Sequence, residues 1–167
     1  MKMSKMIFII SFIETAFLFI ACTSAIAQEK KITEKDLPSS VITAFHKKYP
    51  KARIKGLSTE IEQGKKYYEI VSIDGITKRD LLFTKTGKIV EIEETISATE
   101  LPKGSIKSIE KNFPKAEIAR AEKVTIGSKI TYELAIRSKE NKYEVVLNKE
   151  GKIIKRDKVN GEEGDED

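Results

Sequence analysis

The sequence predicts an α+β protein made of two tandem units, each with one helix and a four-stranded antiparallel meander. Three observations lead to this fold class: an internal repeat at a constant offset, one helix-like apolar stripe per repeat, and glycine-containing turns between strand-like segments. Because a unit of this size buries little surface alone, we expect the two to share one curved sheet with both helices on one face.

The repeat has an offset of 64 residues and needs no gap. The matching segments are Leu37-Pro38 with Leu101-Pro102, Pro50-Lys51-Ala52 with Pro114-Lys115-Ala116, Tyr68-Glu69 with Tyr132-Glu133, and Gly87-Lys88-Ile89 with Gly151-Lys152-Ile153. Matches spread over a whole unit at one offset are typical of a duplicated fold. We predict that the first repeat spans residues 36–95 and the second residues 100–159.

Each repeat is predicted to open with a short helix that ends before a proline. Asp36 and Glu100 stand where an acidic side chain favours a helix N-terminus. Apolar residues at spacings of three and four then form one buried face: Ile42, Phe45 and Tyr49 in the first repeat, and Ile106, Ile109 and Phe113 in the second. The helices end at Pro50 and Pro114, because a proline disfavours helical backbone in the residue before it.

Four strand-like segments follow each helix. In the first repeat they cover about residues 52–61, 67–73, 76–84 and 88–95, and Gln63-Gly64, Asp74-Gly75 and Thr86-Gly87 separate them. A two-residue Asp-Gly connection between strands is typical of a hairpin. Connections this short require neighbouring strands to be antiparallel.

Residues 1–27 have the order of a secretory signal peptide: basic residues, an apolar run, and small residues ending at Ala27. The apolar run contains Glu14 and is shorter than a membrane-spanning helix requires. An alternative is a lipoprotein box ending at Cys22, in which case the chain is tethered to a membrane through that lipidated cysteine. We therefore expect a periplasmic or secreted protein cleaved after Ala27, with residues 28–35 as a linker.

The charge of the chain is distributed unevenly. Residues 160–167 are predicted to form an acidic, disordered tail, whereas residues 28–160 carry 29 basic and 20 acidic side chains, a net charge of +9. A charge of this size favours anionic partners and solubility, without specifying a fold. Nucleic acid is not an expected partner, because the basic residues lack interleaved aromatic stacking positions.

No residue pattern indicates an active site, a metal site or a cofactor site. His46 is the only histidine, and cleavage after Ala27 would leave no cysteine, which excludes His/Cys metal clusters and Cys-His catalysis. Glu69 and Glu133 recur at equivalent positions beside Tyr68 and Tyr132, but strand alternation explains them as outward-facing partners of buried tyrosines. We predict a protein that is not an enzyme and has no cofactor.

The duplicated pattern of Leu-Pro, a short helix, Tyr-Pro or Phe-Pro, a strand pair with Tyr-Glu and a Gly-Lys-Ile turn resembles the PepSY-like family, which is related to the β-lactamase inhibitor protein fold. The resemblance covers nearly all of the expected mature chain. It implies a curved sheet with helices behind it, in an exported bacterial protein that binds or inhibits other proteins. The expected mature chain lacks the cysteines and tryptophan of the inhibitor protein, so we do not predict β-lactamase inhibition.

Strand alternation suggests which residues form a binding face. In the second repeat Tyr132, Leu134 and Ile136 are expected to point inward. The same register in the first repeat gives a helix-free face that is more apolar than its counterpart, and its candidate residues are Tyr67, Glu69, Val71, Ile73, Lys78 and Leu82. Exposed apolar groups rimmed by charges are typical of a protein-binding surface. The alternative is that the other repeat or a second subunit covers these side chains.

The residue patterns leave two functions open. The first is an exported, non-catalytic module that binds or inhibits another envelope or secreted protein through the helix-free sheet face. The second is an envelope protein that binds an anionic small ligand, glycan or lipid through its basic surface. A membrane partner is expected only if Cys22 is lipidated.

Overall fold

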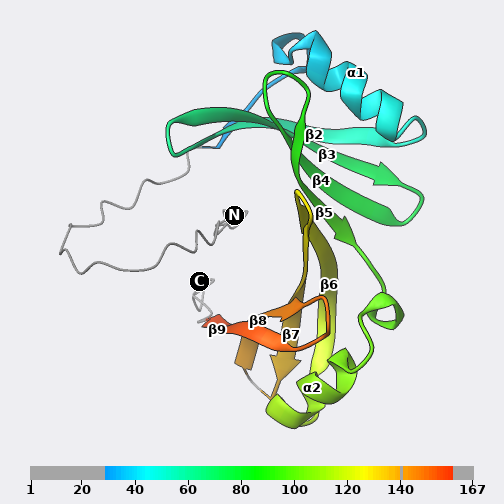
Figure 1. Ribbon diagram of the computed structural model, residues 1–167, viewed down its shortest axis with the longest axis vertical. Helices are drawn as coiled ribbons and strands as arrows, with labels where there is room; N and C mark the ends of the chain where they lie inside the picture. Colours follow the sequence, from blue (N-terminus) through cyan, green and yellow to red (C-terminus); the bar gives the residue numbers. More distant parts are fainter. Residues whose placement is uncertain (1–28, 140, 160–167) are drawn as a thin grey trace, which may run out of the picture.

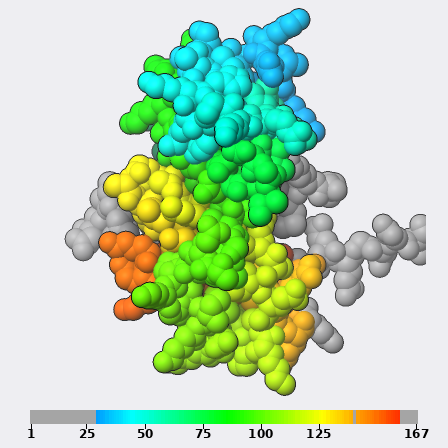
Figure 2. Space-filling model, turned by 90° about the vertical axis from the view of Figure 1, so that its right-hand side faces the viewer, coloured from blue at the N-terminus to red at the C-terminus, as the bar shows by residue number. Residues whose placement is uncertain are grey.

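The computed structural model describes residues 29–139 and 141–159, which form one curved antiparallel sheet with two α-helices on its outer side (Figure 1). The predicted leader at residues 1–27, Cys22 and the acidic tail at residues 160–167 lie outside the described residues. The nine strands follow the chain order β1 to β9 across the sheet, so each strand pairs with its sequence neighbour. Seen from the outer side, α1 and α2 occupy opposite ends of the molecule (Figure 2).

The elements alternate between short helices and long strands. The helices are α1 (Ser39–Lys48) and α2 (Ser105–Asn112), preceded by the 3₁₀ turns η1 (Glu34–Asp36) and η2 (Ala98–Glu100). The strands are β1 (Lys30–Lys31), β2 (Arg53–Glu62), β3 (Lys65–Asp74), β4 (Thr77–Phe83), β5 (Ile89–Thr95), β6 (Glu117–Ile126), β7 (Lys129–Ser138), β8 (Asn141–Asn148) and β9 (Ile153–Val159).

The predicted fold class, two units of one helix plus a four-stranded meander, is wrong. The described chain is mostly a single nine-stranded sheet, because β5 pairs with β6 from Glu91↔Ile126 to Thr95↔Glu122. A meander that ended at β5 would leave a row of unpaired backbone N–H and C=O groups on that strand, and β6 satisfies them. The sequence predicted eight strands, and the additional one is β1, which pairs with β2. It lies within residues 28–35, the segment expected to be a linker.

The two halves of the sheet have the same spacing. Strands β2 to β5 begin at residues 53, 65, 77 and 89, and strands β6 to β9 begin at residues 117, 129, 141 and 153, a constant difference of 64. The irregularity of register between Ile54 and Gly56 recurs between Ile118 and Arg120, at the same offset. A repeated irregularity bends both halves of the sheet at equivalent points.

Each helix covers a separate core on the outer side of the sheet. Under α1, Val41 and Phe45 are fully buried against side chains of β3 and β4, namely Tyr68, Ile70, Leu81 and Phe83. Under α2, Ile109 and Phe113 pack on side chains of β7 and β8, namely Leu134, Ile136, Val145 and Leu147. Burial of each of these large apolar side chains contributes about 1.5–3 kcal/mol, so two small cores hold the ends of the arc.

The helix starts differ from those expected. Asp36 does not cap α1, because its carboxylate accepts a hydrogen bond from the backbone N–H of Thr33 at 2.9 Å and so closes the η1 turn. In the second half, α2 begins only after Gly104, which has a positive φ of 88°. Ile106 then lies in the first turn of α2 and is 43% exposed instead of joining the predicted apolar stripe.

Gly87 allows α1 to approach the turn between β4 and β5. Its φ is +81°, and a Cβ at this position would lie 2.4 Å from the carbonyl oxygen of Ser40 in α1. Gly75, in the turn between β3 and β4, also has a positive φ of +59°, but nothing lies within 4 Å of its Cβ position. The positive φ favours glycine at both positions. Only at Gly87 would a side chain also clash with a neighbouring residue.

We therefore predict that Gly87→Ala lowers the free energy of unfolding by about 1–3 kcal/mol more than Gly75→Ala, because only the first substitution adds a clash to the cost of a positive φ. Urea unfolding followed by circular dichroism measures both values. Equal losses for the two variants would contradict the close packing of α1 on this turn.

Candidate functional site

The six residues expected to form a binding face lie together on the helix-free side of the sheet. In β3, Tyr67, Glu69, Val71 and Ile73 alternate with residues that are buried under α1. The register Glu69↔Leu82 and Ile73↔Lys78 places the two β4 residues on the same side. Because the helices lie on the outer side of the arc, this face is the inner, concave one (Figure 1).

The apolar members of this face are less accessible than the sequence suggested. Leu82 is only 5% exposed, and Tyr67, Val71 and Ile73 are half-buried. Leu82 is covered because it lies between Glu69 of β3 and Glu91 of β5. The carboxylates around it, not the aliphatic groups, therefore dominate the chemistry of the concave face.

Seven carboxylates form an acidic band across the concave face from β2 to β7, with one or two on each strand. The acidic band consists of Glu60, Glu69, Asp80, Glu91, Glu93, Glu122 and Glu133. The register pairs Asp80 with Glu93 and Glu122 with Glu133, so like charges lie directly opposite each other. Such pairs destabilise a sheet when both carboxyl groups are ionised.

Three members of the band have basic or polar neighbours. Lys78 Nζ lies 3.2 Å from Asp80, and the Ser58 hydroxyl donates a hydrogen bond to Glu69. Arg120 lies 3.5 Å from Glu122, on the second half of the sheet. These contacts offset part of the negative charge of the band.

Burial and mutual repulsion keep the central carboxyls protonated at higher pH than usual. Burial, followed by the charges of Glu93, Glu62, Glu133 and Glu60, raises the pKa of Glu91 to about 8. Burial, followed chiefly by the charge of Glu69, raises the pKa of Glu60 to about 7. Both groups therefore titrate close to neutral pH.

The middle of the acidic band contains a recess of about 20 Å³. Its lining residues are Glu60, Glu69, Asp80, Leu81, Leu82, Glu91 and Glu93. The recess therefore joins two of the predicted face residues, Glu69 and Leu82, to four carboxylates outside the predicted set of six. Glu91 and Glu93 alternate along β5, but buried carboxylates are uncommon, so solvent-facing positions are the ordinary expectation for them.

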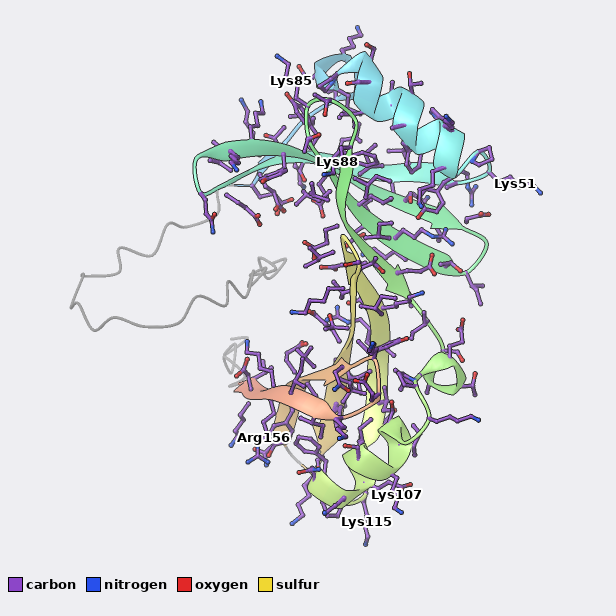
Figure 3. The ribbon with its side chains drawn as sticks, in the orientation of Figure 1. Lys51, Lys85, Lys88, Lys107, Lys115 and Arg156 are labelled. Carbon is purple, nitrogen blue, oxygen red and sulfur yellow. The ribbon has the colours of Figure 1, made fainter. Side chains whose placement is uncertain are left out.

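A second depression lies between α2 and β9. It is an open groove of about 470 Å³, lined by Ser108, Asn112, Lys152, Ile153, Ile154, Lys155 and Arg156. Exposed basic side chains surround both ends of the arc, including Lys51, Lys85 and Lys88 near α1 and Lys107, Lys115 and Arg156 near α2 (Figure 3). Basic side chains thus surround the two ends of the arc, whereas the concave centre is acidic.

The part of the chain that the structure describes contains no group of three or more His, Cys, Asp or Glu side chains placed to hold a metal ion. His46 is exposed on α1, and its ring lies 5.3 Å from that of Phe45. Within the same residues, no helix has the length and apolar character needed to cross a membrane.

Comparison with known proteins confirms the resemblance found in the sequence. A family model described as "Putative beta-lactamase-inhibitor-like, PepSY-like" matches residues 24–90 and residues 66–155, which together cover most of the chain. That description names no catalytic activity. No curated protein matches the chain.

Several solved structures share the fold at low sequence identity. A "putative periplasmic" protein from Bacteroides eggerthii has 16% identity and a TM-score of 0.62, covering 74% of this chain and 89% of that one. A DUF2874 family protein from Bacteroides uniformis has 16% identity and a TM-score of 0.61, covering 73% and 89%. A BLIP-like protein from Bacteroides fragilis has 14% identity and a TM-score of 0.58, covering 76% and 90%.

The raised pKa of Glu91 predicts a pH dependence of stability. Between the ordinary value of 4.5 and about 8, the folded protein binds more protons than the unfolded chain, so the free energy of unfolding falls as the pH rises through this window. Glu91→Gln should flatten the decline and be more stable than the wild type at pH 8. Urea unfolding at a series of pH values tests this.

The matched control is Glu110→Gln, which removes the same charge from an exposed position on α2. It should leave the pH dependence unchanged. If Glu91→Gln and Glu110→Gln give the same curve as the wild type, the central carboxyl does not titrate as described.

Proposed function

The chain belongs to the PepSY-like, β-lactamase-inhibitor-like family, and from that premise we propose that it is a non-catalytic module of the bacterial envelope that binds another protein through its concave sheet face. A protein of similar fold is described as periplasmic, which supports this location. The signal peptide expected at residues 1–27 supports it as well.

The observation that carries the proposal is that the helices cover only the convex side of the sheet. The concave side keeps Tyr67, Val71 and Ile73 half-buried beside a band of carboxylates, with no element of the described chain packed over them. Aromatic and aliphatic side chains surrounded by polar groups are the usual composition of a protein interface. A curved sheet also presents these groups on a rigid surface, which reduces the entropy lost on binding.

The proposal predicts that a photo-reactive benzoylphenylalanine in place of Tyr67 crosslinks to one discrete partner in intact cells, whereas the same probe in place of Lys107 does not. The alternation of β3 places Tyr67 on the concave face. Lys107 is exposed on the convex side, on α2. Mass spectrometry of the adduct identifies the partner. Equal crosslinking from both positions would contradict a specific concave interface.

A substitution then tests whether the same face supplies affinity. Val71→Ser should weaken binding of the identified partner about tenfold, the cost of truncating one well-packed interface residue at about 1–2 kcal/mol. Ile106→Ser removes a partly exposed aliphatic side chain from α2 and should have no effect. Isothermal titration calorimetry measures both variants, and circular dichroism verifies that they are folded.

A second candidate function is the binding of an anionic small ligand, glycan or lipid through the basic groove between α2 and β9. The groove is large enough for a small ligand, and Lys152 and Arg156 line it. These side chains are exposed, so the affinity should fall steeply between low and physiological salt. Heparin-column retention of the wild type and of a Lys152→Gln/Arg156→Gln double variant measures this function independently of the concave face.

A further inference from the structure

Glu91 is a buried carboxyl at the centre of the concave face. It is 6% exposed and lines the recess together with side chains from β2, β3, β4 and β5. Within residues 29–139 and 141–159, no hydrogen bond or ion pair reaches its carboxyl group, and the charged neighbours that raise its pKa, Glu93, Glu62, Glu133 and Glu60, are all negative. Burying such a group without a donor is costly unless it stays protonated or receives a cation.

The surroundings of Glu91 select for a positively charged ligand. Glu60, Glu69, Asp80 and Glu93 line the same recess, so an anion would be repelled and a neutral ligand would leave the repulsion in place. Asp80 and Glu69 already interact with Lys78 and Ser58. Glu91 and Glu60 are the acceptors that a new cation would meet.

The size of the recess restricts the cation further. About 20 Å³ accommodates a group of roughly the volume of one water molecule. A lysine ammonium is a compact charge with three donors, whereas the planar guanidinium of arginine is larger and needs a wider slot. Leu82 lines the same recess and offers apolar surface to the methylene chain that carries an ammonium.

A free divalent ion fits the recess less well than an ammonium. Calcium takes about six to eight oxygen ligands at short distances, and magnesium demands a near-octahedral set. No three carboxylates among the described residues are placed to hold a metal ion, so the site would have to rearrange. An ammonium needs only hydrogen-bond acceptors, which two or three carboxylates supply without converging on one point.

We propose that the recess in the acidic band is a lysine-binding site, in which Glu91 and Glu60 receive the ammonium group of a lysine that projects from the partner protein. This inference rests on the proposed function, because it names the feature by which a partner is recognised on the concave face. It also accounts for the cluster of opposed carboxylates, since a docked ammonium converts their repulsion into attraction.

The site has a consequence for the pH dependence of binding. Docking an ammonium requires carboxylates that are ionised, while the charges of Glu60 on β2, Glu93 on β5 and Glu133 on β7 favour a protonated Glu91 before docking. Glu69 on β3 and Asp80 on β4 face the same recess. Binding should therefore release protons near pH 7, and the affinity should rise between pH 6 and about 8.

The test uses an N-acetylated, C-amidated peptide of four lysines, spaced by glycines, as the probe. Calorimetry at pH 7 in two buffers of different ionisation enthalpy should show binding to the full chain with release of about one proton. Glu91→Gln should weaken binding about tenfold and abolish the proton release. Glu110→Gln, which removes a charge from an exposed position on α2 and away from the recess, should keep both near their wild-type values.

Three further probes define what would overturn the inference. The ε-acetylated peptide and the arginine analogue should bind at least tenfold more weakly than the lysine peptide. Calcium chloride at about 1 mM should neither bind at Glu91 nor displace the peptide. Equal binding of the arginine analogue, displacement by calcium, or wild-type behaviour of Glu91→Gln would each exclude a lysine site.

The two proposals fail in different ways. If benzoylphenylalanine at Tyr67 captures a partner but the lysine peptide does not bind, the concave face is an interface without a lysine-binding recess. If the peptide binds through Glu91 but no adduct forms at Tyr67, the recess holds an ammonium and the proposed protein interface is wrong.

Discussion

The antiparallel pairing of β5 with β6 is the interaction on which the rest of the structure depends. Each helix covers a small core at one end of the sheet, and the ladder between these two strands joins the halves that carry them. The ladder therefore fixes the relative position of the two cores. It also makes the concave face continuous across the two halves, because Glu91 and Glu93 of β5 lie opposite Ile126 and Val124 of β6.

The two halves joined by this ladder have the same backbone arrangement but different concave surfaces. The strand starts and the register irregularities repeat at a constant offset, so the two halves use the same backbone plan. Their concave surfaces differ, because the acids accumulate in the first half and at the junction while Arg120 compensates Glu122 and Glu144 in the second. A shared plan with unlike faces is what allows one of two copies to specialise for recognition without loss of the fold.

Much of the backbone could be predicted from sequence, and most of the site could not. Turns such as Asp74-Gly75 and the period-two alternation of β3 are local signals, and they are enough to place Tyr67, Glu69, Val71 and Ile73 on one side of the strand. The burial of Leu82 and the recess around Glu91 depend on which side chains of neighbouring strands become partners, in particular across the ladder between β4 and β5. Contacts of that kind produce no periodic pattern in the sequence. The late start of α2, which exposes Ile106, produces none either.

The two borders of the sheet are protected by different means. At one border β1 is only two residues long and consists of Lys30 and Lys31, so it offers little backbone to a foreign strand. At the other border, β9 is seven residues long and carries Lys155, Arg156 and Lys158. Short or positively charged edge strands discourage β-pairing between molecules. An open sheet of this breadth can thus avoid edge-to-edge aggregation in a crowded compartment, with its inner curve left accessible.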